Sequence, residues 1–430
     1  MKKSSNKLVL VFLAMMLAGV AFAQQPALQY FRPNNQDGLN VFEPSKIDTV
    51  GFQGVKVRVG GDFALQFQSL NQSNANKNLV ELGSDFNLPS ANLNLDVQLL
   101  DGVRMHLRSY LSSRHHNDFY IKGGHLRVDN LNFIKPGFLE GVMKYASITV
   151  GYDEFNYGDA HFRRSDNARG LFNPFVENFI MDAFSTEPFG EIEVQKNGLL
   201  AIVGLTNGKL NQKVVVDSKS DNKPSFYGKV GFDKQLSDLR VRLTGSWYIN
   251  HGLTTGAYLY GGDRAGARYY YVMHTVPDDA GKVEGADFEG RFNAKFAKQN
   301  AFQINPFIKF KGLELFGIYE LADGSNTFTE PAADEEGSYT QMAGELVYRF
   351  GANDKFYLAG RYNTINGKAL ESATIDQKIE RYNIGGGWFL SKNILAKIEY
   401  VRQQYTGKGW TGRFNDAEFN GVNFEAVIGF

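Results

Sequence analysis

The sequence predicts an all-β protein whose 430 residues form a transmembrane antiparallel β-barrel of 16 strands, with 18 strands as the alternative count. Short turns are expected on the periplasmic side and long loops on the outside. Three observations predict this fold. They are a two-residue alternation of apolar and polar side chains, connections that alternate between short and long, and a last strand that ends on an aromatic residue.

The composition excludes several classes of protein. Hydrophobic residues make up 43% of the chain and aromatic residues 14%, which is enough for a large folded body and excludes a disordered protein. The absence of Cys excludes thiol catalysis, Cys-ligated zinc and iron–sulfur clusters. Basic and acidic residues balance at 46 each, so the net charge favours no nucleic-acid partner.

The start of the chain has the pattern of a secretory signal peptide. Lys2, Lys3 and Lys7 precede an apolar stretch at 8–20, and Ala21-Phe22-Ala23 supplies an A-x-A cleavage site. The alternative is a membrane anchor, but a spanning helix needs roughly 20 apolar residues. We therefore expect a signal peptide at 1–23, a periplasmic N-terminal segment at 24–52 that lies free or against the mouth of the barrel, and the barrel at 53–430.

Alternation at a period of two residues runs along much of the chain. Between 55 and 67 the odd positions are apolar, for example Val57 and Phe63, whereas even positions include polar residues such as Arg58 and Asp62. Such alternation indicates a sheet with one apolar face and one polar face. The same pattern recurs at 92–99, 103–108, 240–249 and 288–296.

The connections separate a transmembrane barrel from a soluble sandwich, because a sandwich has no reason to alternate short and long connections. A propeller would show a fixed sequence period, and we find none. Short turns are expected at 101–102, 196–198, 235–238, 298–300, 351–354 and 391–393. Long polar connections are expected at 71–90, 207–223, 322–337, 366–377 and 406–417.

Two segments decide between the two strand counts. The segment 268–274 is doubtful as a strand, and in the lower count 301–310 continues into 313–321 as one strand. Both counts are even, so both place the two termini in the periplasm. A barrel of 16 strands leaves an aqueous channel. The connection at 135–144 is long for the periplasmic side and favours a short helix.

The last strand carries a distinctive pattern. Val422, Phe424, Ala426, Ile428 and Phe430 share one face, and the aromatic Phe430 ends the chain. This resembles the C-terminal signal by which the barrel assembly machinery recognises outer-membrane barrels; the alternative is an ordinary edge strand that ends in Phe. The resemblance implies that machinery and outer-membrane lipid as partners, and the outer membrane of a Gram-negative bacterium as the location.

Other segments carry a family resemblance. They are 30–34, 38–43, 305–307, 344–351, 386–390, 397–401 and 425–430. Through them the chain resembles the porin family of the Bacteroidetes outer membrane, which has the character of phosphate-selective-type and DcaP-like porins. The likeness covers most of the mature chain and is most specific in its last third. It implies a homotrimeric passive diffusion channel for small hydrophilic solutes or ions, and it fixes no solute.

The third long connection, 154–186, is expected to control passage. In general porins the third external loop folds into the lumen and narrows it, so the resemblance implies the same role here. Opposed charges in a narrow passage orient dipolar solutes and bias ions, because partial dehydration strengthens their field. The charged residues of this loop are Glu154, Asp159, Arg163, Arg164, Asp166, Arg169, Glu177 and Asp182.

A basic wall is expected to face this loop. Its members are the arginines on the polar face of early strands, namely Arg58, Arg104, Arg108 and Arg127. Together with the loop charges they form the predicted pore lining. The alternative is that these residues are solvated lumen groups that pair among themselves.

Catalytic chemistry receives little support from the sequence. His115, His116, His125 and His161 lie in one part of the chain but lack a metal-ligand spacing. No G-x-S-x-G motif marks a nucleophile elbow. We therefore expect no enzyme activity, no metal and no cofactor. Two alternatives stay open: a barrel-embedded outer-membrane hydrolase, and a surface adhesin or structural barrel without a pore.

Overall fold

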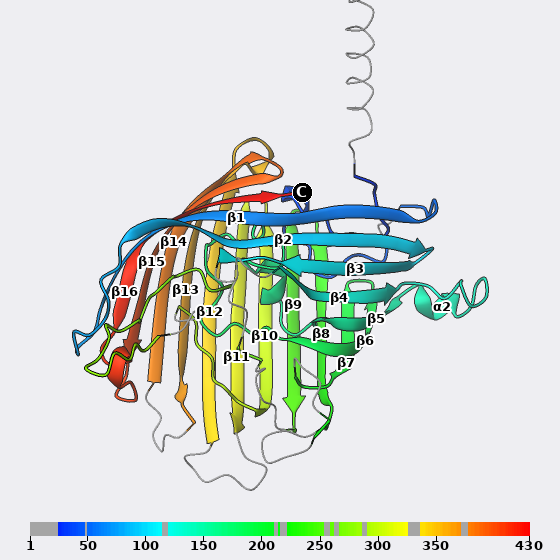
Figure 1. Ribbon diagram of the computed structural model, residues 1–430. Coiled ribbons are helices and arrows are strands. Elements are labelled where there is room, and N and C mark those ends of the chain that lie inside the picture. The colour runs from blue at the N-terminus through cyan, green and yellow to red at the C-terminus, as the bar shows by residue number, and fades with distance from the viewer. Residues whose placement is uncertain are drawn as a thin grey trace, which may run out of the picture.

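The computed structural model describes a closed barrel (Figure 1). Within the described residues, sixteen antiparallel strands each pair with their neighbours in the sequence, and β16 returns to pair with β1. The predicted fold class and the count of 16 strands are therefore confirmed. The described residues are 25–47, 50–113, 119–209, 214–215, 222–252, 259–261, 266–285, 290–325, 336–370 and 377–430, so the predicted signal peptide lies outside them.

The strands follow one another around the barrel without a crossover. They are β1 (Lys56–Ser73), β2 (Ser84–Leu100), β3 (Val103–Tyr110), β4 (Tyr120–Val128), β5 (Ala146–Glu154), β6 (Thr186–Lys196), β7 (Leu199–Thr206), β8 (Ser225–Leu236), β9 (Leu239–Asn250), β10 (Lys298–Phe310), β11 (Leu313–Ser325), β12 (Glu336–Phe350), β13 (Phe356–Lys368), β14 (Gln377–Ser391), β15 (Ile394–Thr406) and β16 (Glu418–Gly429). Short 3₁₀ turns, η1 (Gln36–Gly38), η3 (Ala160–Arg163), η5 (Ala352–Asp354) and η6 (Gly412–Phe414), lie outside the strands.

The first and last strands, β1 and β16, close the barrel. β1 pairs with β16 in a regular register in which Phe67 lies opposite Phe424, and the two rings are 6.3 Å apart between centroids. Gly61 and Phe430 exchange backbone hydrogen bonds of 3.0 and 3.1 Å. Figure 1 shows the carboxyl terminus beside β1. The terminal aromatic residue thus completes the sheet, which leaves no open edge between the first and last strands.

The two faces of the strands explain why the chain alternates. In β7, Leu199, Val203 and Leu205 point outwards and are 54–61% exposed, whereas Ile202 between them is buried at 3%. Rows of exposed Leu and Val would be strongly unfavourable in contact with water. The same rows are favourable in contact with lipid. The outer face therefore fits the apolar band of a membrane barrel.

Aromatic side chains gather on the outer face near the ends of three strands. Tyr348, Phe350, Phe356 and Trp388 form a row of stacked rings with successive centroids 5.8–6.0 Å apart, and each ring is exposed. Amphipathic and aromatic rings favour the headgroup depth of a bilayer, where porins carry aromatic girdles.

None of the described helices is long and apolar enough to cross a bilayer.

Short and long connections fall on opposite ends of the barrel, as predicted. The tight turns include 101–102, 197–198, 237–238, 311–312 and 392–393. The connection from β4 to β5 is the long member of the turn end, and it contains the predicted short helix as α2 (Glu140–Met143), which projects beyond the strands in Figure 1.

Three details of the strand assignment were wrong, although their errors cancel in the total count. Segments 301–310 and 313–321 belong to separate strands, β10 and β11, joined by a tight turn in which Lys311 adopts a φ of 52°. The triplet 298–300, expected as a turn, begins β10. Between 288 and 296 the described residues form no strand, because Phe292 and Phe296 pack on Tyr339 inside the barrel rather than alternating across a sheet. The doubtful segment 268–274 is not a strand, in agreement with the count of 16, which leaves it out.

Candidate functional site

The connection between β5 and β6, residues 155–185, lies inside the barrel, and we call it the lumen loop. Most of its side chains are buried, with Phe175 and Ile180 fully so. Its backbone is held by strands from different sides of the wall. The Gly170 amide donates to Asp62 of β1 at 2.8 Å, and the Val176 amide donates to Glu399 of β15 at 2.8 Å. The loop therefore crosses the interior instead of projecting outside.

Asp159 is the most heavily bonded carboxylate of the lumen loop. It accepts hydrogen bonds from Lys229 of β8 at 2.9 Å and from Arg242 and Thr244 of β9 at 2.8 Å each. Burial alone would raise the pKa of Asp159, but the charges of Arg242 and Lys229 hold it well below its ordinary value. Asp159 therefore stays ionised and fastens one side of the loop to the wall.

The N-terminal segment, residues 25–47, shares this anchor. Glu43 pairs with Arg242 at 2.8 Å and with Lys229 at 3.4 Å. Burial opposes ionisation of Glu43, yet Arg242 and Lys229 lower its pKa to about 2. Phe42 packs edge-on against Phe162 of the lumen loop and Phe307 of β10, with centroids 5.7 and 5.3 Å apart.

The other predicted loop residues are ion-paired, except Glu177, which accepts a hydrogen bond from the Arg268 amide at 2.6 Å. Arg164 bonds to Asp166 at 2.8 Å and to Asp182 at 2.5 Å, and Lys122 of β4 pairs with Asp166 at 3.2 Å. These contacts join the loop charges to one another and to β4, and their place in the pore lining stays a prediction. Two further pairs, Arg163 with Glu345 of β12 and Arg169 with Glu154, hold the loop against the strands.

Three of the four wall arginines lie side by side on the inner face of β3 and β4, where Arg104 is the register partner of Arg127. Each has a carboxylate partner. Arg104 bonds to Asp129 at 3.1 Å, Arg108 to Asp153 at 3.1 Å and Arg127 to Glu193 at 2.6 Å. The fourth, Arg58 of β1, stacks on the ring of Phe31 at 4.9 Å.

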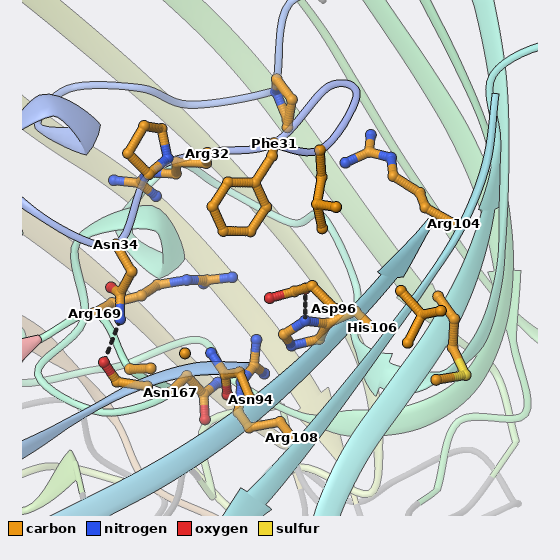
Figure 2. Close-up of a pocket in the computed structure, with 18 of the residues that line it drawn as sticks. Phe31, Arg32, Asn34, Asn94, Asp96, Arg104, His106, Arg108, Asn167 and Arg169 are labelled. Carbon is orange, nitrogen blue, oxygen red and sulfur yellow. Dashed lines mark hydrogen bonds and ion pairs between the residues drawn. The ribbon is translucent and has the colours of Figure 1, made fainter. Parts of the chain in front are cut away.

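A cavity of about 170 Å³ lies between this wall, the N-terminal segment and the lumen loop. Figure 2 shows Phe31 and Arg32 from the N-terminal segment on one side, Asn167 and Arg169 from the lumen loop on another, and the side chains of β2 and β3 facing them. We call this cavity the arginine chamber. Its charged lining consists of Arg32, Arg104, Arg108 and Arg169, against the single carboxylate of Asp96, with His106 and His125.

A second cavity of about 190 Å³ adjoins the arginine chamber and shares several of its side chains, among them Arg32 and Arg108. Its charges are balanced, because carboxylates accompany the arginines. Its acidic lining residues are Glu43, Asp153, Glu154, Glu191 and Glu193. The two cavities together trace free space along the β1–β6 side of the barrel.

Arg32 is a site residue that the sequence did not reveal. It donates to the carbonyl oxygens of Gly38 and Phe162, each at 3.1 Å, and it stacks on Phe172 at 3.8 Å. Burial lowers the pKa of Arg32 well below its ordinary value, and the nearby charge of Arg169 lowers it further. The N-terminal segment has no alternation, so its sequence pattern predicts no role for Arg32, and its Arg and aromatic residues are the only signal of the site.

The histidines are paired rather than grouped. His125 lies 3.0 Å from Asp153, and His161 contacts Asn156 at 2.9 Å. The described part of the chain contains no group of three or more His, Asp or Glu side chains that could hold a metal ion. His115 and His116 lie outside the described residues.

His161 makes the docking of the lumen loop dependent on pH. Burial lowers its pKa from an ordinary value of 6.5 to about 4, although Glu154 opposes this shift. The undocked loop therefore takes up a proton more readily than the docked one. The contribution of neutral His161 to the stability of the docked loop is complete above pH 6.5 and is lost as the pH falls towards 4.

We expect proteolytic cleavage of the lumen loop to accelerate as the pH falls over this interval. The variant His161→Gln should make the cleavage rate less dependent on pH. An unchanged pH profile in that variant would contradict the assignment.

Comparison with known proteins gives a fold and no close relative. No protein-family model and no curated protein matches the sequence. Solved structures do match. The anion-selective porin from Comamonas acidovorans has a TM-score of 0.53 at 10% identity, covering 87% of this chain and 100% of that chain. The chain has the fold of an outer-membrane porin.

Two other similar structures have the same character. The outer membrane channel DcaP of Acinetobacter baumannii has a TM-score of 0.51 at 11% identity and covers 88% of this chain and 99% of that chain. The trimer form of OmpT, an outer membrane protein of Vibrio cholerae, has a TM-score of 0.51 at 11% identity and covers 88% of this chain and 100% of that chain. At this identity the likeness concerns the porin fold alone.

Proposed function

We propose that this porin-fold chain is an outer-membrane channel for the passive diffusion of small hydrophilic solutes or ions in a Gram-negative bacterium. The observation that carries the proposal is the lumen loop, which lies within a closed barrel whose outer face is apolar. Such an outer face belongs in lipid, and an interior lined by charged side chains gives polar solutes a route that lipid denies them. No residue is assigned a catalytic role.

The lumen loop has the role of a constriction in this proposal. Its anchors to β1, β9 and β15 draw it across the interior, and the spaces it leaves beside the β1–β6 wall measure about 170 and 190 Å³. For scale, a cavity of roughly 150 Å³ accommodates benzene. Solutes of about that size should therefore pass more readily than large sugars.

The partners follow from the same proposal. The apolar outer strip would contact outer-membrane lipid, and the C-terminal strand that ends in Phe430 would be the signal for the barrel assembly machinery. A homotrimer belongs to the proposal as well, and so does a position of the N-terminal segment at the periplasmic mouth of the barrel, from which it reaches the lumen loop. They agree with the porin fold, with the trimer form of one similar structure, and with the short turns at the end of the barrel where the N-terminal segment lies.

Liposome swelling tests the proposed size limit. Vesicles that contain the purified full-length chain are diluted into isotonic glycerol, glucose or maltose. We expect fast swelling in glycerol, slow swelling in glucose and almost none in maltose, because the free cavities beside the lumen loop are small. Swelling in maltose as fast as in glycerol would contradict a constriction, and no swelling in any solute would contradict the channel.

A further inference from the structure

The arginine chamber is lined by one arginine, Arg32, that forms no ion pair with a carboxylate of the described residues. Arg32 donates to the backbone carbonyl oxygens of Gly38 and Phe162 and stacks on Phe172. Asp96, the carboxylate of the chamber lining, is engaged by His106 at 2.7 Å. A guanidinium without a carboxylate partner can stabilise an anion that enters the chamber.

Two arginines of β3 also have unused donors at the chamber. Arg104 Nη2 and Arg108 Nε have no hydrogen-bond partner within the described chain, although Arg104 donates through Nε to Asp129 and Arg108 through Nη1 to Asp153. The Arg108 side chain is only 5% exposed. Buried donors of this kind are normally satisfied, and a charged guanidinium forms its strongest hydrogen bonds with an oxyanion.

The chamber also presents unused acceptors. Asn167 donates through Nδ2 to Glu154 at 2.7 Å, which fixes the orientation of its amide and leaves Oδ1 as an acceptor. The Oδ1 atom of Asn94, on β2, is likewise without a partner in the described part of the chain. An amide oxygen needs a donor, which a simple carboxylate cannot supply but a hydroxyl group can.

We propose that the arginine chamber is a binding site for a small hydroxylated oxyanion, which carries an anionic group for the arginines and a hydroxyl group for the asparagines. The volume of about 170 Å³ suits a ligand of about three or four carbons. Carboxylate and phosphate groups share the required chemistry. The inference deepens the proposed function by naming a class of solute, and it rests on that function only for the way the solute reaches the chamber.

Calorimetric titration of the full-length chain in detergent tests the site without requiring a current. The probes are glycerate, glycerol 3-phosphate, propionate and glycerol. We expect glycerate or glycerol 3-phosphate to bind at least about tenfold more tightly than propionate, since an unmet hydrogen bond to a buried polar group is costly, and we expect no binding of glycerol. The tighter of the first two identifies the anionic group. Equal binding of glycerate and propionate, or no binding of either anion, would overturn the proposal.

Two variants separate the charge from the hydroxyl contact. Arg32→Gln removes a cation without leaving a carboxylate unpaired, and should weaken glycerate and propionate alike, by about tenfold. Asn167→Gly keeps a residue suited to the φ of 60° and should weaken glycerate alone. The control, Arg402→Gln, alters an exposed outer pair with Glu418 and should change neither. Unchanged affinities in the first two variants would exclude this chamber.

The binding measurement and the transport measurement fail separately. Binding of glycerate in detergent without solute-dependent swelling would support the binding site and contradict the channel. Swelling of vesicles in glycerol without binding of a hydroxylated anion would support the channel and contradict the binding site.

Discussion

Replacing the lumen loop, residues 155–185, with a four-residue turn is expected to raise single-channel conductance by at least about threefold. A barrel of 16 strands has room for an aqueous channel, and the loop fills part of that room beside the N-terminal segment and residues 290–297. The replacement is geometrically simple. Glu154 and Thr186 are register partners on adjacent strands, so a short hairpin can join them. Planar-bilayer recordings of both proteins at the same salt concentration provide the comparison.

The shortened protein needs a control for folding, because the loop also contributes buried side chains to the interior. A retained β-sheet signal in circular dichroism and a retained shift in electrophoretic mobility on heating would show that the barrel is intact. Lys229 would keep Glu43 as its partner and Glu399 would keep the Tyr269 hydroxyl, so neither of these wall groups would be left without a polar contact. An intact barrel with unchanged conductance would contradict the role of the lumen loop as the constriction.

Replacing Asp159 with Ala is expected to release the lumen loop from β8 and β9. The change leaves Lys229 with Glu43 alone, and Arg242 with Glu43 and a longer contact of 3.4 Å to Asp233. Loss of one partner from a buried ion pair costs about 3–5 kcal/mol. We expect a lower free energy of unfolding in urea and faster proteolysis within the loop, together with noisier channel currents.

A matched substitution at the surface serves as its control. Asp37 pairs with Lys392 at 2.9 Å, but both side chains are more than half exposed. An exposed pair contributes at most about 1 kcal/mol, so Asp37→Ala should change the stability little. Equal effects of Asp37→Ala and Asp159→Ala would show that burial of the Asp159 anchor is not what holds the loop.

The carboxylates Glu43 and Asp159 determine the pH below which the ion pairs with Lys229 and Arg242 weaken. The pKa of Glu43 is lowered to about 2 and that of Asp159 is also depressed, so both contribute stability above their ordinary pKa values. That contribution is lost only as the pH falls below about 4 towards the folded-state values. The anchor should therefore persist through the interval in which His161 takes up its proton, and the two effects can be separated by pH.

Much of the fold could be predicted from the sequence because each strand carries its own signal. The alternation in β1 and the pattern of the last strand can be recognised within a few residues, and similar alternation recurs in other strands because each has one face toward lipid. Turn assignment was less certain. Lys311-Gly312 joins two strands with two residues, which leaves little sequence between them to mark a turn, whereas the polar triplet 298–300 resembles a turn although it starts β10.

The candidate site could be predicted only in part. Arg104 and Arg108 lie on the polar face of a recognisable strand, so their inward direction follows from alternation. Their partners do not, because pairing with Asp129 and Asp153 depends on the course of connections and neighbouring strands. Arg32 could not be placed at all, since a segment without periodicity reaches the chamber by tertiary contacts alone.

The central claim is that a water-filled passage runs through this barrel beside the lumen loop, and recording the full-length chain in planar bilayers tests it most directly. The account predicts discrete current steps of small amplitude that scale with salt concentration. A correctly inserted barrel that gives no steps at any voltage would contradict it, and detection of lipid or peptide hydrolysis by that barrel would favour an enzyme instead.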